Sequence, residues 1–399
     1  MNTQVRVEAL DRRENLLQES PKSFVVGTYG DFESLPLSYH RVFEEHSASS
    51  FCHSLPWYQN FSQYALDPGD QVRIYAVESA GLPGTPLAIL PVRYVSGVAK
   101  RGRAKSLSSL TNYYTMLYAP LVSPEVSLPE VLGELARFVF AESPRWDMVN
   151  LSCLDRDSPV FSELARSFRR AGMIVQTYFC FGNWYLPVEG RTYQQYFESL
   201  RSSVRNIAKS KNRKVERSGR ARVEVVTGMN GLDAAISAYE QVYAASWKKS
   251  EPYPLFVPGL IQLCAREGWL RLGVAYVDGQ PAAAQLWIVS HGVASIYKVA
   301  YDQRFADLSI GSYLTTRLLE HVIDVDRVRE VDYLSGDDRY KSDWMSHRRE
   351  RWGILALNPR TVRGALGIIR HIGGRSLKRA ALRVWRRLAA TREKPGAIS

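Results

Sequence analysis

Two stretches of this chain repeat one order of predicted secondary structure: three strands, then helix, strand, helix and strand. Each predicted strand is a short apolar run between turn residues, and the predicted helices carry apolar side chains every three or four residues. Strands that alternate with helices predict an α/β fold with mixed sheets flanked by helices. The first stretch has these elements at residues 72–77, 87–94, 112–122, 128–141, 148–152, 161–171 and 177–186, and the second at 270–277, 282–289, 294–301, 312–325, 331–334, 338–344 and 352–357.

The length of the chain fits two such units. It has 399 residues, and a typical domain takes about 150. We expect a flexible N-terminus at 1–24, a first domain at 25–190, a second domain at 191–358 and a basic amphipathic tail at 359–399. With 45% hydrophobic and 23% charged residues, the composition excludes collagen-like, coiled-coil and wholly disordered chains.

Several kinds of protein and site lack support in the sequence. The longest apolar runs, such as 281–289, are shorter than the roughly 18–20 residues of a membrane-spanning helix. Residues 1–20 contain Arg, Asp and Glu and no apolar core of a signal peptide, so we expect a cytoplasmic protein. The four cysteines lie far apart, without a CxxC or Cys/His cluster, which predicts neither a disulfide scaffold nor a metal site. The motifs of serine and zinc hydrolases are absent.

Two segments carry the basic character of the chain. The formal net charge is +12. Residues 360–394 contain eleven Lys or Arg and one acidic residue, and residues 201–222 contain nine Lys or Arg and one acidic residue. The remainder is therefore mildly acidic, which argues against a uniformly basic nucleic-acid-binding protein. The pattern indicates two local surfaces that face polyanions.

A series of motifs in the second half carries a resemblance to a known family. In chain order they are Ser246-Trp247-Lys248, 268–272 (GWLRL), Asp278-Gly279, 282–285 (AAAQ), Tyr297-Lys298, Tyr301-Asp302, Ser309-Ile310-Gly311, and 332–344 with Gly336-Asp337, Tyr340-Lys341 and Trp344. This order resembles the GNAT-superfamily acyltransferases of the CelD type, bacterial proteins linked to cellulose and other exopolysaccharides. They are relatives of the Fem-type aminoacyl transferases. The motifs cover about 190–357, and Ile310 stands where the family commonly has Pro.

The resemblance implies tandem GNAT-like domains with the active site in the second. The implied reaction is N-acyl transfer from acyl-CoA, as co-substrate, to an amino group of a sugar or a cell-envelope or polysaccharide precursor. In this fold the pyrophosphate lies at a helix N-terminus, where backbone N–H groups are unpaired. The residues at that place are Arg304, Ser309, Ile310, Gly311 and Ser312. Ser309 could equally be an ordinary N-cap.

The segment 332–344 supplies the candidates for catalysis. A carboxylate such as Asp337 or Asp332 could take a proton from the attacking ammonium, and Tyr340 could return one to the leaving thiolate. Lys341 could stabilise the oxyanion or pair with a phosphate. The alternative is structural: Asp337 or Asp338 caps a short helix, Lys341 pairs with an Asp, and Trp344 belongs to the core.

The candidates for substrate binding come from the surrounding motifs. Gln285 is a polar residue in an apolar strand, so it needs hydrogen-bond partners if it is buried. Tyr297 and Lys298 should lie on opposite faces of their strand, so only one can point into a cleft. Trp247 and Asp332 complete the set.

The two basic segments leave alternatives open. Residues 191–218 are predicted as one long basic helix, either solvated or in contact with phosphates of tRNA, a nucleotide-linked sugar or coenzyme A. The tail, with Leu, Ile and Trp among its arginines at 361–392, either lies on an anionic membrane or docks on the protein. Fem-type aminoacyl transfer from charged tRNA and a non-catalytic scaffold at a polysaccharide synthase are the alternative functions.

Overall fold

The computed structural model describes residues 24–95 and 104–373. Its first half contains β1 (Phe24–Tyr29), α2 (His40–Ser47), α3 (Leu55–Tyr64), β2 (Asp70–Ser79), β3 (Pro86–Val95), β4 (Ser106–Ser109), β5 (Leu121–Val122), α4 (Leu128–Ala141), β6 (Met148–Asp155), α5 (Pro159–Arg170) and β7 (Ile174–Pro187). The second half contains α6 (Tyr193–Ser199), α7 (Ser202–Ser218), β8 (Ala221–Val226), α8 (Leu232–Ala244), α9 (Phe256–Arg266), β9 (Leu270–Val277), β10 (Gln280–Ser290), β11 (Val293–Tyr301), α10 (Ile310–Glu320), β12 (Glu330–Ser335), α11 (Lys341–Trp344), β13 (His347–Leu357) and α12 (Val362–Ile368). This order confirms the predicted α/β class.

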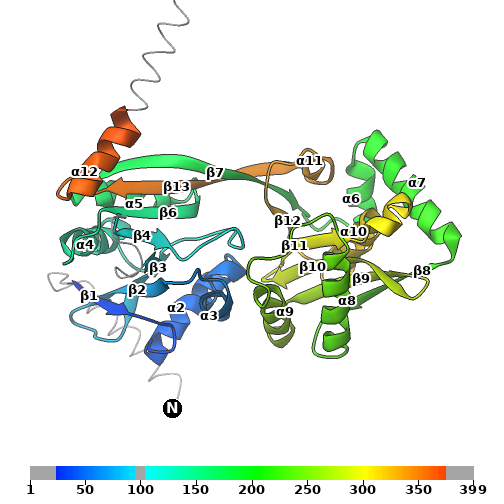
Figure 1. Cartoon of the computed structure of the whole chain (residues 1–399), viewed down its shortest axis with the longest axis horizontal. Coiled ribbons are helices and arrows are strands. Elements are labelled where there is room, and N and C mark those ends of the chain that lie inside the picture. The colour runs from blue at the N-terminus through cyan, green and yellow to red at the C-terminus, as the bar shows by residue number, and fades with distance from the viewer. Residues whose placement is uncertain (1–23, 96–103, 374–399) are drawn as a thin grey trace, which may run out of the picture.

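All thirteen strands belong to one sheet that runs through both halves (Figure 1). Its order is β1-β2-β3-β4-β6-β13-β7-β12-β11-β10-β9-β8, with β5 paired to β3. Each half contains one parallel pair, β4 with β6 and β11 with β12, among antiparallel neighbours. The two halves therefore have matching topologies, as the repeated order of predicted elements suggests.

The last strand of each half is exchanged between the halves. β13 closes the second half in sequence, but it pairs with β6 of the first half. β7 closes the first half in sequence, but its end pairs with β12 of the second. β7 and β13 also pair with each other along eleven registered positions, and the two long strands span both bodies in Figure 1. Neither half therefore has a complete sheet without the other.

A shared apolar core joins the halves below the exchanged strands. α3 packs against α9, and Trp57 meets Phe256 edge to face, with ring centroids 5.7 Å apart. Gly259 permits this close approach, because a Cβ there would lie 2.6 Å from Oδ1 of Asn60. Tyr114 stacks on Phe256 at 4.1 Å. Burial of large aromatic side chains is among the strongest stabilising contributions to such a junction.

Two predicted elements differ in detail. Residues 112–122 were expected to form a strand, but only Leu121–Val122 is β-structure, because the Asn112 side chain folds the segment into a turn by accepting from the Tyr114 N–H. The expected long basic helix is two helices, α6 and α7. A capping box of Thr192 and Gln195 starts α6, and extended backbone at Leu200 ends it before α7 begins.

The C-terminal segment is described only at its start. α12 and the turn of helix after it (Ile369–Gly373) expose Val362, Leu366 and Ile369. The remainder of the predicted tail and nearly all of the predicted N-terminal segment lie outside the described residues. Within 24–95 and 104–373, no helix is long and apolar enough to cross a bilayer.

Candidate functional site

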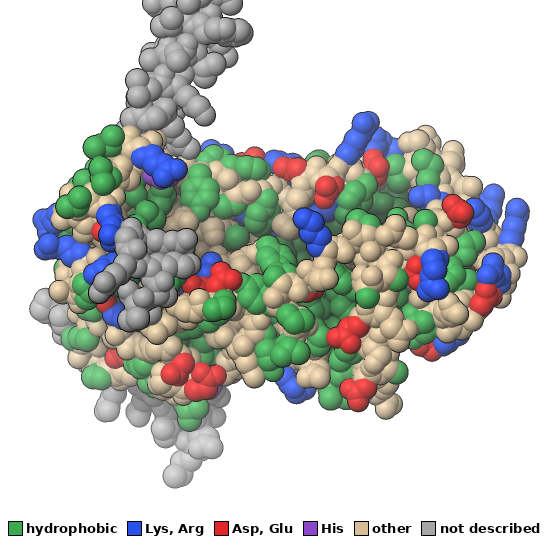
Figure 2. Space-filling view, viewed as in Figure 1, with side chains coloured by type: hydrophobic (Ala, Val, Ile, Leu, Met, Phe, Trp, Pro, Cys, Tyr) green, Lys and Arg blue, Asp and Glu red, His purple; other side chains and the backbone are tan. Residues whose placement is uncertain are grey.

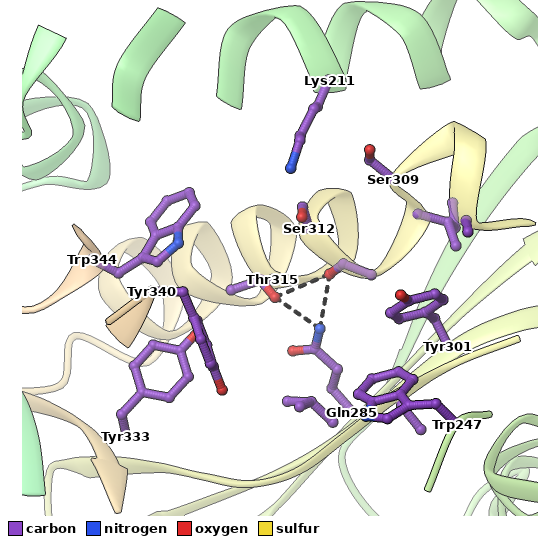
Figure 3. A pocket seen from close by; sticks show the side chains of 15 residues that line it. Lys211, Trp247, Gln285, Tyr301, Ser309, Ser312, Thr315, Tyr333, Tyr340 and Trp344 are labelled. Atoms are coloured by element: carbon purple, nitrogen blue, oxygen red, sulfur yellow. Dashed lines mark hydrogen bonds between the residues drawn. The ribbon is translucent and has the colours of Figure 1, made fainter. Parts of the chain in front are cut away.

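A cavity of about 320 Å³ opens at the N-terminal end of α10. Figure 3 shows the first turns of α10 along its centre, with α7 on one side and aromatic side chains at both ends. The wall is formed by Lys211, Trp247, Gln285, Val299, Ala300, Tyr301, Ala306, Ser309, Ile310, Gly311, Ser312, Thr315, Tyr333, Tyr340 and Trp344. The lining thus comes from the second half alone.

The cavity exists because two parallel strands diverge. β11 and β12 pair only over Val293–Ser295 and Glu330–Asp332. Beyond Ser295, β11 keeps its partner β10 on one edge, but no strand of the described residues pairs with its other edge. Strand backbone carries strong donors and acceptors that need partners. The open edge near Val299–Tyr301 can therefore pair with the amides of an extended ligand.

The start of α10 is built to receive an anion. Ser309 precedes the helix in the left-handed conformation (φ 55°), and no side chain caps the first turn. The early N–H groups of a helix have no intrahelical partner, and the helix dipole places partial positive charge there. Gly311 lies against Tyr301, since a Cβ would be 3.2 Å from that ring. Gly at this position keeps the first turn close to the cavity floor.

Gln285 holds α10 against the sheet. Its amide nitrogen donates to the Gly311 carbonyl at 2.9 Å and to the Thr315 hydroxyl at 2.8 Å, as the dashed lines in Figure 3 show. Its amide oxygen accepts from the Trp287 indole at 3.0 Å. The buried amide is therefore satisfied by the protein itself, and Gln285 positions the helix whose first turn lines the cavity.

Lys211 supplies the cationic side of the cavity. It projects from α7 toward Ser312 in Figure 3, and no acidic side chain of the described chain lies within ion-pair distance of it. Figure 2 shows blue side chains gathered at the end of the molecule where α7 lies. The free ammonium and the uncapped helix start together make this end of the cavity electropositive.

Aromatic side chains close the opposite end. Tyr333 and Tyr340 meet edge to face at 5.8 Å, and Trp344 lies beside them. Burial raises the pKa of Tyr340 above its ordinary value, and the nearby Asp338 adds to the effect. Burial also raises the pKa of Tyr333. Both phenols therefore remain protonated at neutral pH, and Tyr340 is available as a proton donor.

Two residues predicted for catalysis lie outside this cavity. Asp337 is held by Arg348 through a two-pronged ion pair at 2.8 and 2.9 Å, and the hydrogen bonds from Arg348 lower the pKa of that carboxyl. Lys341 is buried, donates to the carbonyls of Ser335 and Tyr333, and has its pKa lowered by burial. Lys341 thus braces the chain segment that carries Tyr333.

Three further predicted residues also lie elsewhere. Arg304 lies outside the lining of the cavity and pairs with Asp302 at 2.6 Å. Tyr297 is buried between the halves and donates to the Tyr114 carbonyl at 2.9 Å. Asp332 lies on the other face of β12 and is paired with Arg349 at 2.5 Å.

A β-bulge explains the position of Tyr297. The β10–β11 register shifts between Leu286 and Trp287, leaving one extra residue in β11. Such a residue breaks the alternation of side chains between the two faces of a strand. Tyr297 and Lys298 therefore both reach Tyr114, the tyrosine through its hydroxyl and the lysine over the ring at 4.7 Å. The expectation that they lie on opposite faces is wrong.

The other predicted residues line the cavity, together with residues that the motifs did not single out. Ser309, Ile310, Gly311, Ser312, Trp247, Gln285 and Tyr340 all line it. Thr315 and Tyr333 were missed, and Lys211 was recognised only as one charge in a basic helix. Thr315 lies four residues after Gly311 on a helix, a spacing that would have placed both on one face.

Comparisons with known proteins agree with this geometry. Residues 202–342 match the family model of the acetyltransferase (GNAT) domain. The crystal structure of FemX superposes with a TM-score of 0.55 at 9% identity, over 84% of this chain and 96% of FemX. A conserved protein of unknown function from Bacteroides thetaiotaomicron gives 0.50 at 9% identity, over 84% and 100% of the two chains. A tandem GNAT protein from the clavulanic acid biosynthesis pathway gives 0.44 at 12% identity, over 83% and 98%. No curated protein matches the chain.

These identities show likeness of fold, and the domain match supports a transferase. The chain contains a GNAT-type acetyltransferase domain at 202–342 within a two-part α/β fold similar to that of FemX.

Proposed function

We propose that the protein transfers an acyl group from acyl-CoA to an amino group of a sugar or cell-envelope precursor. The observation that carries this proposal is the cavity at the start of α10, where an uncapped helix terminus and Lys211 face an open strand edge. The helix terminus and the ammonium suit a diphosphate. The edge of β11 suits the amides of a pantetheine arm, which would point the thioester toward Tyr340.

The transfer step uses few side chains. The neutral amine attacks the thioester carbonyl, a C–N bond forms, and the tetrahedral intermediate collapses with loss of the C–S bond. Tyr340 gives its proton to the departing thiolate, a role that its raised pKa allows at neutral pH. The attacking nitrogen loses its proton to water, since the cavity wall of the described chain includes no Asp, Glu or His.

A titration of thermal stability tests the proposal. The purified protein is titrated with acetyl-CoA, longer acyl-CoAs and free CoA. A ligand at about 100 times its Kd adds about 2.7 kcal/mol of apparent stability. We expect a saturable rise in Tm that varies with acyl length. A protein whose Tm responds to none of these ligands would contradict the acyl-CoA proposal.

Aminoacyl transfer from charged tRNA is the second candidate. It is favoured by the exposed cations of α7 outside the cavity, among them Lys209, Arg213 and Arg217. Binding through several phosphates falls steeply with salt. Filter binding of tRNA at 50 and 200 mM salt separates the two candidates, because coenzyme A offers far fewer phosphates than tRNA. Salt-insensitive or absent tRNA binding would exclude the second candidate.

Two further proposals concern the cell context. A scaffold role at a polysaccharide synthase predicts partner binding without turnover, so detectable transfer to any amine would oppose it.

Contact of the basic tail with an anionic membrane predicts that the full chain sediments with vesicles containing phosphatidylglycerol. Removal of residues 360–399 should abolish that sedimentation, and unchanged sedimentation would contradict the membrane proposal.

A further inference from the structure

A second cavity, of about 230 Å³, lies where the two halves exchange their strands. Its floor is one face of the sheet, with Asp155 of β6, Asn183 of β7, and residues of β11, β12 and β13. The cover consists of 48–51, which follow α2, and of Met116 and Leu117. Both halves therefore contribute to this wall, whereas the cavity at α10 belongs to the second half alone.

Within the described residues, the wall of this cavity contains two buried polar atoms that have no hydrogen-bond partner. Arg351 is 3% exposed, yet its Nη1 donates no hydrogen bond. The carboxylate nearest to that nitrogen is Asp155, at 3.4 Å and half-exposed at the cavity edge. Ser290 is 6% exposed, and its hydroxyl also lacks a partner. A buried polar group without a partner is costly and rare, so two on one cavity wall point to a ligand that satisfies them.

The other charges around the cavity are already engaged. Arg349 donates to Asn183 at 2.6 Å, to Glu330 at 2.7 Å and to Asp332 at 2.5 Å. Arg351 reaches the Asn183 oxygen only at 3.4 Å. Arg329 is exposed and donates to the carbonyl of His291. The donors left without a hydrogen bond on the floor are therefore Nη1 of Arg351, which lies 3.4 Å from Asp155, and the hydroxyl of Ser290.

The balance of charge indicates the class of ligand. The wall carries three arginines and three acidic side chains, Asp155, Glu330 and Asp332. A doubly charged anion such as phosphate would meet repulsion from these carboxylates. A single carboxylate matches the fork of a guanidinium and adds only one negative charge. We propose that this cavity binds a small carboxylate-bearing ligand through Arg351 and Ser290.

This inference stands apart from the proposed acyl transfer, because the two cavities have no lining residue in common. It is tested by thermal unfolding of the full chain with sodium acetate, L-lactate and D-glucuronate. Sodium chloride and inorganic phosphate at equal ionic strength serve as reference anions. We expect at least one carboxylate to raise Tm with a saturable dose dependence, beyond the effect of either reference anion.

Three variants locate the effect. Arg351→Met should abolish the carboxylate-dependent shift, and Ala48→Phe should abolish it by filling the mouth of the cavity at an exposed position. Ala48→Phe leaves the floor of the cavity intact, so it still tests whether the carboxylate binds in this cavity if Arg351→Met does not fold. Arg348→Met, on the opposite face of β13, should retain the shift. A shift that chloride or phosphate reproduces, a shift that survives both cavity variants, or no shift at all would overturn the proposal.

Discussion

Helix α4 in the first half and helix α10 in the second half have equivalent places in the topology, but the residues of their first turns differ in chemistry. α4 lies in sequence between the parallel partners β4 and β6, and α10 lies between the parallel partners β11 and β12. The first three positions of α4 are Leu128, Pro129 and Glu130, and those of α10 are Ile310, Gly311 and Ser312. Pro129 removes one backbone donor and Glu130 adds negative charge. The segment just before α4 lines a cavity that contains Glu125 and, across from it, Glu45 paired with Arg41. An anion is therefore disfavoured at α4 and favoured at α10.

The gap between the two parallel strands is filled in the first half and open in the second half. β4 and β6 pair over three residues, as β11 and β12 do. In the first half the chain after β4 fills the gap, since the Tyr118 N–H donates to the Cys153 carbonyl at 2.9 Å and Thr111 bonds Ser152 at 2.9 Å. In the second half the corresponding gap stays open as the cavity at α10. The same topology thus has a filled gap in the first half and an open cavity in the second half.

The largest effect should come from giving α10 the acid that α4 carries. Ser312→Glu places a carboxylate at the third helical position inside the cavity. Two like charges about 4 Å apart at a partly solvated site cost about 4 kcal/mol, so we expect acetyl-CoA to bind about 100- to 1,000-fold more weakly. Isothermal titration calorimetry measures this change.

The stability of the same variant separates binding from folding. An acidic residue in the first turn of a helix stabilises it by about 0.3–1 kcal/mol, so the Tm of Ser312→Glu without ligand should be unchanged or higher. Ser312→Gln is the control of matched size and should retain most of the affinity. Full affinity in Ser312→Glu would contradict the placement of the diphosphate.

Removal of the proton donor should have the next largest effect. Tyr340→Phe keeps the ring against Tyr333 and loses the hydroxyl, so kcat should fall about 100-fold, while KM for acetyl-CoA should change little. Because the pKa of Tyr340 is raised, its loss of the proton should not limit turnover below about pH 10, and the rise of activity with pH should follow the acceptor amine. A variant with normal kcat would remove Tyr340 from the mechanism.

The junction between the halves provides the third prediction. Glu251 accepts from Tyr113 at 2.8 Å, from Tyr114 at 2.5 Å and from Lys298 at 2.6 Å. Burial tends to raise the pKa of Glu251, but the hydrogen bonds from Lys298, Tyr114 and Tyr243 outweigh it and lower the pKa to about 2. A depressed carboxyl pKa stabilises the fold above the unfolded value and loses that contribution as the pH falls from about 4.5 to about 2.

Glu251→Gln should therefore lower the free energy of unfolding by about 2 kcal/mol at pH 7 and by progressively less toward pH 2. Urea unfolding at several pH values measures the difference. Glu240→Gln, at an exposed position on α8, is the control and should change little. A cost for Glu251→Gln that is equal at pH 7 and pH 3 would contradict the ion-pair explanation.

Lys211→Met should produce a smaller loss. Removal of the ammonium beside the start of α10 should weaken acetyl-CoA binding about tenfold and reduce its dependence on salt. Lys209→Met alters the same helix at a residue that lies over Phe197 and outside the cavity, so it should have almost no effect. Equal losses in both variants would mean that only the overall charge of α7 matters.

The smallest effect is expected for Arg304→Ala. Arg304 belongs to the predicted set of phosphate-binding residues and precedes Ser309–Ser312 in sequence, but its guanidinium is solvated and pairs with Asp302. We expect less than a twofold change in acetyl-CoA affinity, as for most surface substitutions. A tenfold loss would show that Arg304 turns toward the ligand when it binds.

The sequence predicts those parts of the fold and site that depend on neighbours along the chain. Apolar periodicity locates most helices and strands, and the strand-to-helix context of Ser309–Ser312 locates the cavity. The exchange of β7 and β13 depends on pairing between residues more than 140 positions apart, and no local pattern records it. The bulge that redirects Tyr297 lies within the β10–β11 hairpin, and Arg348 pairs with Asp337 eleven residues earlier, but apolar periodicity predicts neither.

Hydrogen–deuterium exchange with and without saturating acetyl-CoA tests the difference between the two helix starts most directly. We expect slower exchange at 309–315 and along 299–301, with no change at 127–133. Slower exchange at 127–133, or unchanged exchange at 309–315 at ligand concentrations that raise Tm, would contradict this expectation.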